Sequence, residues 1–146
     1  MIGNLHFNKR FTLGKQAEEQ FEKYLTKKNI IFRREKVNDT YEPDYIKRHT
    51  PDYYLPEKKT FVEFKSTHNL REDLIPAYNQ WFNTYVNSHE YMFYIAVHTA
   101  DMDCVEFYSL VCLTTDFPTW KISGEWNDGK RYYTIPQETE CLTWRL

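Results

Sequence analysis

The spacing of apolar residues along the chain predicts two helices. Residues 12–29 carry apolar side chains at intervals of three and four and contain no proline, which favours a helix. A second helix is predicted over residues 70–87, with Pro76 in its first turn or at a kink. The apolar stripe of this second helix consists of Leu74, Tyr78, Trp81 and Tyr85.

Four further stretches have the composition of strands: residues 30–37, 91–98, 105–113 and 131–135. The stretches 91–98 and 105–113 are almost continuously apolar, as in strands buried on both faces. Residues 38–50 are polar and rich in tyrosine, and we interpret them as a loop or an extended arm. The strand–helix–strand order from residue 61 to residue 97 implies a crossover. We therefore expect an α/β fold, a mixed β-sheet core flanked by helices with extra C-terminal strands, in a single domain over residues 1–146.

A predicted hairpin, residues 51–56 and 60–65, places charges among apolar residues. Side chains alternate between the two faces of a strand, so Phe61, Glu63 and Lys65 share one face. Burying charges is costly unless they pair or hold a metal. Asp52 begins the first strand and Glu63 lies in the second. These two carboxylates could converge on one divalent cation.

Composition limits the possible function. The chain has 146 residues, of which 41% are hydrophobic and 18% aromatic, as in a folded domain with a core. A net charge of −2 argues against a strongly basic nucleic-acid coat. A local basic patch remains possible: Lys47, Arg48 and His49 could contact phosphates or form a solvated loop, and Arg71 is a further candidate DNA contact.

Cysteine usage and hydropathy suggest where the protein works. Cys104, Cys112 and Cys141 are odd in number and widely spaced, so we expect three reduced thiols in a cytosolic protein. The N-terminal residues lack an apolar signal core, and no stretch approaches the length of a membrane span. The expected location is the cytoplasm, or the host cytoplasm if a phage encodes the protein, with no membrane partner.

The hairpin carries the groups that phosphodiester cleavage requires. Magnesium takes oxygen ligands, usually one or two carboxylates with waters and substrate phosphate. Asp52 and Glu63 can supply the carboxylates, and the main-chain carbonyl of Phe64 could add a ligand. Lys65 could steady the attacking water or neutralise negative charge. Glu18 lies at the edge of the buried face of the first helix and is a third candidate carboxylate, although a solvated acidic face is an equal alternative.

The sequence Pro51-Asp52, followed eleven positions later by Glu63-Phe64-Lys65, resembles the PD-(D/E)XK nuclease superfamily. The similarity is closest to the phage endonuclease I type, which resolves Holliday junctions, and spans roughly residues 13–66. It implies a restriction-endonuclease-like fold, hydrolysis of DNA with Mg²⁺ (or Mn²⁺ in its place), and a homodimer acting on branched DNA. It also implies that Glu18 is the first-helix acid, Asp52 and Glu63 the paired metal ligands, and Lys65 the catalytic lysine.

The chain departs from that family in two ways. The tail is aromatic and ends in Thr143-Trp144-Arg145-Leu146, where the phage enzyme is rich in lysine. A second Pro-Asp pair, Pro43-Asp44, makes Asp44 an alternative to Asp52 as the motif acid. The alternative function is a catalytically inactive nucleic-acid-binding or assembly protein on the same fold. The intact set of Asp52, Glu63 and Lys65 favours an enzyme.

Overall fold

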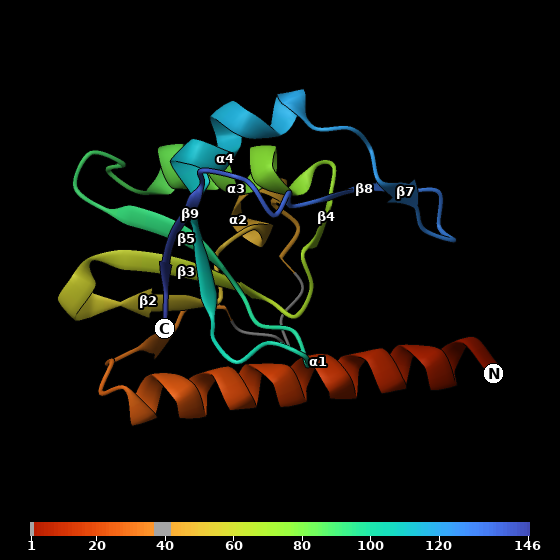
Figure 1. Ribbon diagram of the computed structural model, residues 1–146, viewed down its shortest axis with the longest axis horizontal. Coiled ribbons are helices and arrows are strands. Elements are labelled where there is room, and N and C mark those ends of the chain that lie inside the picture. The colour runs from red at the N-terminus through yellow and green to blue at the C-terminus, as the bar shows by residue number, and fades with distance from the viewer. Residues whose placement is uncertain (1, 37–41) are drawn as a thin grey trace.

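The computed structural model describes residues 2–36 and 42–146, with side chains from residue 15 onward. The main sheet is sandwiched between helices (Figure 1). The long helix α1 (Ile2–Lys27) runs along one face, and α3 (Leu74–Tyr85) and α4 (Leu110–Asp116) cover the other. This arrangement lets each element bury its apolar side against a neighbour.

The main sheet has six strands and is mixed. Its spatial order is β1 (Arg33–Arg34), β2 (Tyr53–Leu55), β3 (Thr60–Lys65), β5 (Met92–Val97), β6 (Glu106–Ser109) and β9 (Leu142–Arg145). Strands β3 and β5 are parallel, and every other neighbouring pair is antiparallel. Helix α3 lies in the connection between the two parallel strands. The predicted α/β class with a mixed sheet flanked by helices is confirmed.

A second, smaller sheet is built mainly from the C-terminal part of the chain. Its order is β4 (Asn69–Arg71), β8 (Arg131–Thr134) and β7 (Gly124–Glu125), and it lies to one side of the helical layer (Figure 1). The predicted extra C-terminal strands are therefore present. The short elements α2 (Tyr45–Arg48), η1 (Pro56–Lys58) and η2 (Phe117–Thr119) complete the fold. Over residues 2–36 and 42–146, no helix is both long and apolar enough to cross a membrane.

The two faces of the sheet bury separate clusters of side chains. On the α1 face, Phe21 stacks on Phe64 with ring centroids 4.7 Å apart. On the α3 and α4 face, Tyr78 packs against Phe93. Since side chains alternate along β3, Glu63 falls on the α3 and α4 face together with Phe61.

Several predicted boundaries were wrong. Helix α1 begins at Ile2, ten residues before the predicted start at residue 12. Of the strand predicted over 30–37, residues 30–36 are described, and only Arg33–Arg34 of these form a strand; residue 37 lies outside the described residues. The predicted helix over 70–87 begins only at Leu74, because residues 69–71 pair with β8 as strand β4. Pro76 lies in the first turn of α3, as predicted.

The predicted strand over residues 105–113 is half strand and half helix. Strand β6 ends at Ser109, whose hydroxyl oxygen accepts a hydrogen bond from the Cys112 amide at 3.4 Å and caps α4. Leu110 and Leu113 are buried while Val111 is 63% exposed, which is helical spacing. A short apolar run fits either a buried strand or a buried helix segment, so the sequence pattern could not separate them.

The segment predicted as a loop or arm contains a short helix. Within residues 42–50, Tyr45–Arg48 form α2. The remaining part of the predicted arm, residues 38–41, falls outside the described residues.

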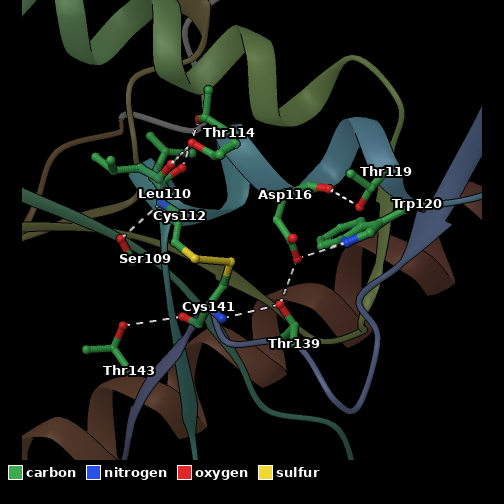
Figure 2. Close-up of a disulfide and its surroundings, with 12 residues drawn as sticks. Ser109, Leu110, Cys112, Thr114, Asp116, Thr119, Trp120, Thr139, Cys141 and Thr143 are labelled. Atoms are coloured by element: carbon green, nitrogen blue, oxygen red, sulfur yellow. Dashed lines mark hydrogen bonds between the residues drawn. A yellow bond between two sulfur atoms is a disulfide. The ribbon is translucent and has the colours of Figure 1, made fainter.

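The C-terminal segment is tied to the rest of the fold in two ways. Strand β8 confirms the prediction over 131–135, while β9, which joins the main sheet beside β6, was missed. Trp144 of β9 stacks on Phe107 of β6, with centroids 4.0 Å apart. Cys112 of α4 and Cys141, just before β9, form a disulfide (Figure 2).

The prediction of three reduced thiols was therefore wrong. The fold brings the Cα atoms of Cys112 and Cys141 to 5.3 Å, within the range that a disulfide spans. Cys104 is a free thiol. Positions 29 residues apart in the sequence meet because Cys141 lies beside Ser109, where β6 ends and α4 begins; the Ser109 amide donates a hydrogen bond to the Cys141 carbonyl at 3.0 Å. Residue spacing does not reveal this contact.

Candidate active site

The β2–β3 hairpin brings Asp52 and Glu63 into contact. Tyr53 pairs with Val62 in the antiparallel register, which sets the preceding Asp52 opposite Glu63. The Asp52 amide donates a hydrogen bond to Glu63 Oε1 at 3.1 Å. In return, the Phe64 amide donates to Asp52 Oδ2, also at 3.1 Å. Each carboxylate is thus held by the backbone of the opposite strand.

Both carboxylates are removed from water. Asp52 is 8% exposed and Glu63 is 2% exposed. Burial and the neighbouring Glu63 carboxylate raise the pKa of Asp52 to about 8, although the Phe64 amide and the positive charge of Lys36 act in the opposite direction. The pair therefore has less compensating positive charge nearby than two ionised carboxylates need.

Two side chains reach Glu63 on the α3 and α4 face. Lys65 Nζ lies 3.3 Å from Glu63 Oε2, and the lysine side chain is 28% exposed. The hydroxyl of Tyr78, on α3, donates a hydrogen bond to Glu63. Burial, reinforced by the Glu63 charge, raises the pKa of Tyr78 well above its usual value, so this phenol remains a donor.

The carbonyl of Phe64 faces the Asp52 side of β3. The carbonyl of Lys65 accepts a hydrogen bond from the His98 amide at 3.1 Å, on the β5 side. Successive peptide groups along a strand point to opposite edges, so the Phe64 carbonyl points toward β2. The Phe64 amide already bonds Asp52 on that edge, as this alternation requires.

Glu18 approaches from the opposite face of the sheet. It lies on α1 one turn before Phe21, which packs in the core of the α1 face. Burial, and then the charges of Glu63 and Glu22, raise the pKa of Glu18. Within the described ranges, no three acidic, histidine or cysteine side chains form a group able to hold a metal ion. Glu18 therefore influences the Asp52–Glu63 pair electrostatically and stands apart from it.

The Asp52–Glu63 pair has the donor set of a magnesium site. Magnesium commonly takes one or two carboxylates and keeps several waters, and two carboxylates with one carbonyl are present here. Burial and the charge of Glu63 raise the pKa of Asp52, and a divalent cation would offset both effects. These residues fit a divalent cation.

The alternative motif acid, Asp44, has a structural role in this fold. Its Oδ1 accepts hydrogen bonds from the amides of Ile46 at 2.9 Å and Lys47 at 3.1 Å, which caps the N-terminus of α2. Asp52 is the Pro-Asp acid that contacts Glu63.

The candidate phosphate contacts on residues 47–49 lie on and just after α2. Lys47 and Arg48 are exposed. The Arg48 guanidinium donates to two backbone carbonyls that precede the helix. His49 packs its ring against Tyr78, with centroids 5.5 Å apart. Since Tyr78 bonds Glu63, this end of α2 adjoins the carboxylate pair.

Arg71, the other candidate DNA contact, is paired within the small sheet. Its Nε and Nη2 lie 3.2 and 3.1 Å from the two carboxylate oxygens of Asp73. This ion pair holds the Arg71 side chain in the turn between β4 and α3.

Sequence reasoning missed three residues around the site. Lys36 follows β1 and lowers the pKa values of both Asp52 and Glu18 by its charge. Glu22 accepts hydrogen bonds from the Tyr53 hydroxyl at 2.8 Å and from Arg34 at 2.7 Å. Tyr78 could have been suspected, because a tyrosine on a buried helical stripe needs a partner for its hydroxyl. Nothing local distinguishes Lys36.

Comparisons with known proteins give one weak structural similarity. No family model matches the chain, and no curated protein matches it. The structure is similar to that of Archaeoglobus fulgidus Hjc, described as a Holliday junction resolvase from an archaeal hyperthermophile. The TM-score is 0.44 at 11% sequence identity, over 83% of this chain and 88% of that one. A similarity of this size does not identify a function; the geometry of the Asp52–Glu63 pair is the basis for one.

Proposed function

We propose that this protein is a magnesium-dependent endonuclease that hydrolyses DNA phosphodiester bonds, with Mn²⁺ able to replace Mg²⁺. The observation that supports the proposal is the reciprocal Asp52–Glu63 pair with Lys65 beside it. Two buried carboxylates and an ammonium group at one end of a sheet are costly for stability. A divalent cation and a phosphate anion would offset that cost.

Asp52, Glu63 and the Phe64 carbonyl are the groups that would hold the cation, with Glu18 as an outer acid. When bound, a divalent cation supplies positive charge next to the phosphate being hydrolysed and favours ionisation of water near neutral pH. The strand register fixes both carboxylates from the backbone, so little reorganisation is needed for them to act together.

The protein's own groups supply the remaining requirements. Hydrolysis adds water across one P–O bond and leaves a phosphate monoester and a hydroxyl group. Lys65, partly exposed beside Glu63, places an ammonium group where it stabilises negative charge developing on the phosphate. Tyr78 holds Glu63 in position through its hydroxyl and is a positioning residue.

For the substrate we propose branched DNA, and for the active form a homodimer. The support is the resemblance of residues 13–66 to the phage endonuclease I type. A two-fold symmetric dimer presents two equivalent sites, which suits a junction with two strands to cut. Contacts near α2, including Lys47 and Arg48, are candidates for holding the DNA backbone.

The test compares four DNA substrates: supercoiled plasmid, linear duplex, single strand and four-way junction. Each is incubated with the full chain and Mg²⁺, Mn²⁺ or EDTA. Glu63→Gln and Lys65→Ala should each lower the cleavage rate about 10³-fold. Glu57→Gln and Lys130→Ala, which change the same residue types at exposed positions away from the pair, should cut like the unmodified protein.

The outcomes separate the candidate functions. Paired nicks across the junction support the branched-DNA assignment, whereas equal cutting of all duplexes supports only the endonuclease. DNA binding without cleavage under either metal would favour the catalytically inactive binding protein. Cleavage by Glu63→Gln at the rate of the unmodified protein would show that the site has been misplaced.

A further inference from the structure

A polar pocket lies beside the candidate active site, on the other side of β5. Its volume is about 360 Å³. It is lined chiefly by His68, Glu106, Tyr108, Thr134, Gln137 and Arg145. These residues come from β6, β8, β9 and the segment that follows β3, so the pocket exists only in the folded chain.

One carboxylate organises the pocket. Glu106 Oε1 lies 2.9 Å from His68 Nε2 and accepts a hydrogen bond from the Tyr108 hydroxyl at 3.0 Å. Glu106 Oε2 accepts a hydrogen bond from Arg145 Nε at 3.3 Å. Burial alone would raise the pKa of Glu106, but these three partners lower it, so the carboxylate is ionised and acts only as an acceptor.

The pocket continues a row of side chains that begins at Lys65. Lys65 pairs with Val97, Val97 with Glu106, and Glu106 with Arg145. Residues directly opposite on neighbouring strands share a face, so all four lie on the α3 and α4 face of the sheet. Three strand spacings of about 4.8 Å separate Lys65 from Arg145, roughly 14 Å. One strand of B-form DNA covers that distance in about four nucleotides.

Arg145 is set to bind an anion from solution. Its guanidinium has five N–H donors, and Glu106 engages it through Nε. The side chain remains 59% exposed, with its terminal nitrogens beyond the contact to Glu106. A planar guanidinium held in this way matches two oxygens of a phosphate group.

We propose that this pocket binds a backbone phosphate of the DNA strand being cut, a few nucleotides from the scissile bond, through Arg145 with His68 beside it. Glu106 and Tyr108 are positioning residues: Glu106 contacts both Arg145 and His68, and Tyr108 donates a hydrogen bond to Glu106. The proposal rests on the proposed endonuclease function. It adds a second point of contact that orients the strand along the row from Lys65 to Arg145.

The experiment measures DNA binding by the full chain in EDTA, where no cleavage occurs. Affinity for labelled single-stranded and four-way-junction DNA is followed by fluorescence anisotropy from about 50 to 200 mM salt. The variants are Arg145→Ala and Arg145→Lys. The matched control is Arg131→Ala, which removes another exposed arginine paired with a glutamate, Glu72, on the smaller sheet.

Arg145→Ala should weaken binding about tenfold at low salt and reduce the slope of log affinity against log salt by roughly 0.7 to 0.9, the value for one lost phosphate contact. Arg145→Lys should keep the slope, because the positive charge remains, but should bind DNA more weakly than the unmodified protein, because lysine lacks the paired N–H donors of the guanidinium group. Arg131→Ala should bind like the unmodified protein. Melting curves verify that each variant is folded.

An unchanged salt slope in folded Arg145→Ala, or an equal loss of slope in Arg131→Ala, would overturn the proposal. If inorganic phosphate raises the melting temperature only when Arg145 is present while the DNA slope stays constant, the pocket binds free anions and the DNA assignment is wrong. Cleavage assays run in parallel keep the two proposals separate. If the unmodified protein cuts DNA but Arg145→Ala leaves the salt slope unchanged, only the phosphate pocket is wrong. If Arg145→Ala changes the slope but the unmodified protein does not cut, only the endonuclease proposal is wrong. If the protein neither binds nor cuts DNA, both are wrong.

Discussion

Asp52 and Glu106 lie at the same end of the main sheet, yet their carboxylates have opposite surroundings. Asp52 faces a second carboxylate, Glu63, and its pKa is raised to about 8 by burial and by that neighbour. Glu106 is also partly buried, but His68, Tyr108 and Arg145 all bond to it, and its pKa is lowered. Burial raises the pKa of both acids, and the neighbouring groups reinforce that shift at Asp52 but reverse it at Glu106.

Each site also contains a tyrosine that bonds to a glutamate. Tyr78 donates to Glu63 and Tyr108 donates to Glu106. At Glu106 this bond completes a set of partners that balances the charge. At Glu63 the tyrosine orients a carboxylate whose neighbour Asp52 is still uncompensated. Of these two sites, the Asp52–Glu63 pair is therefore the one suited to a divalent cation, whereas Glu106 is suited to holding the Arg145 and His68 side chains in place.

Removing one charge from the Asp52–Glu63 pair should have the largest effect on DNA cleavage. Glu63→Gln keeps the size of the side chain and should lower kcat for DNA cleavage about 10³-fold, because a ligand for the cation is lost. Cleavage rates at saturating Mg²⁺ measure this loss. Asp52→Asn should lower the rate similarly, while Glu57→Gln, in an exposed position, should leave it unchanged.

The pH dependence of stability should reveal the cost of ionising Asp52 where it is buried beside Glu63. The pKa of Asp52 is about 8 in the folded protein and near 3.8 when unfolded, so the folded state binds the proton more tightly. The metal-free protein should therefore lose stability as pH rises from about 4 to about 8, at up to about 1.4 kcal/mol per pH unit. Urea unfolding across this range tests the slope.

Two changes should flatten that slope. Asp52→Asn should make the metal-free protein more stable than the unmodified chain at pH 8. Added Mg²⁺ should stabilise the unmodified protein more at pH 8 than at pH 5, since the cation binds the ionised pair. Equal stabilisation by Mg²⁺ in Asp52→Asn and in the unmodified protein would contradict a metal site at this pair.

The strand hairpin could be predicted because its signals are local. The alternation of Phe61, Glu63 and Lys65 sets the face, and the short connection over residues 57–59 sets the register. The meeting of Asp52 with Glu63 follows from those two facts alone. The length and apolar residues of the stretch 91–98 likewise predicted a buried strand, which the structure shows as Met92–Val97.

What could not be predicted depends on contacts between distant segments. Tyr78 reaches Glu63 only because α3 packs on that face of the sheet, and Arg145 reaches Glu106 only because β9 pairs with β6. The apolar run from Leu110 to Leu113 is a helix because Ser109 caps it, a choice that periodicity over four residues cannot make. Glu18 lies on the helix as predicted, and its distance from the pair depends on how α1 crosses the sheet.

Tyr78, beside the Asp52–Glu63 pair, should affect the cleavage rate more than substrate binding. Tyr78→Phe removes the hydrogen bond to Glu63 and should lower kcat about tenfold with little change in KM, because Glu63 loses its orientation. Steady-state kinetics on cleavable DNA separate the two constants. Tyr85→Phe, on the same helix but 47% exposed, is the matched control. An increase in KM with an unchanged kcat would assign Tyr78 to substrate binding instead.

The stability contribution of Glu106 should depend on pH in the opposite direction to that of Asp52, and its effect should be the smallest of those predicted. Because its partners lower the pKa of Glu106 in the folded state, its ionised form contributes stability above about pH 4.5, and this contribution is lost as pH falls through the folded pKa. Glu106→Gln should therefore cost about 1 kcal/mol at pH 7 and should lose less stability than the unmodified protein between pH 5 and pH 3. Urea unfolding of both proteins at these pH values measures the difference. A Glu106→Gln variant that is more stable than the unmodified chain at pH 7 would mean that the surroundings of Glu106, like those of Asp52, disfavour its ionised form. The contrast between the two sites would then no longer hold.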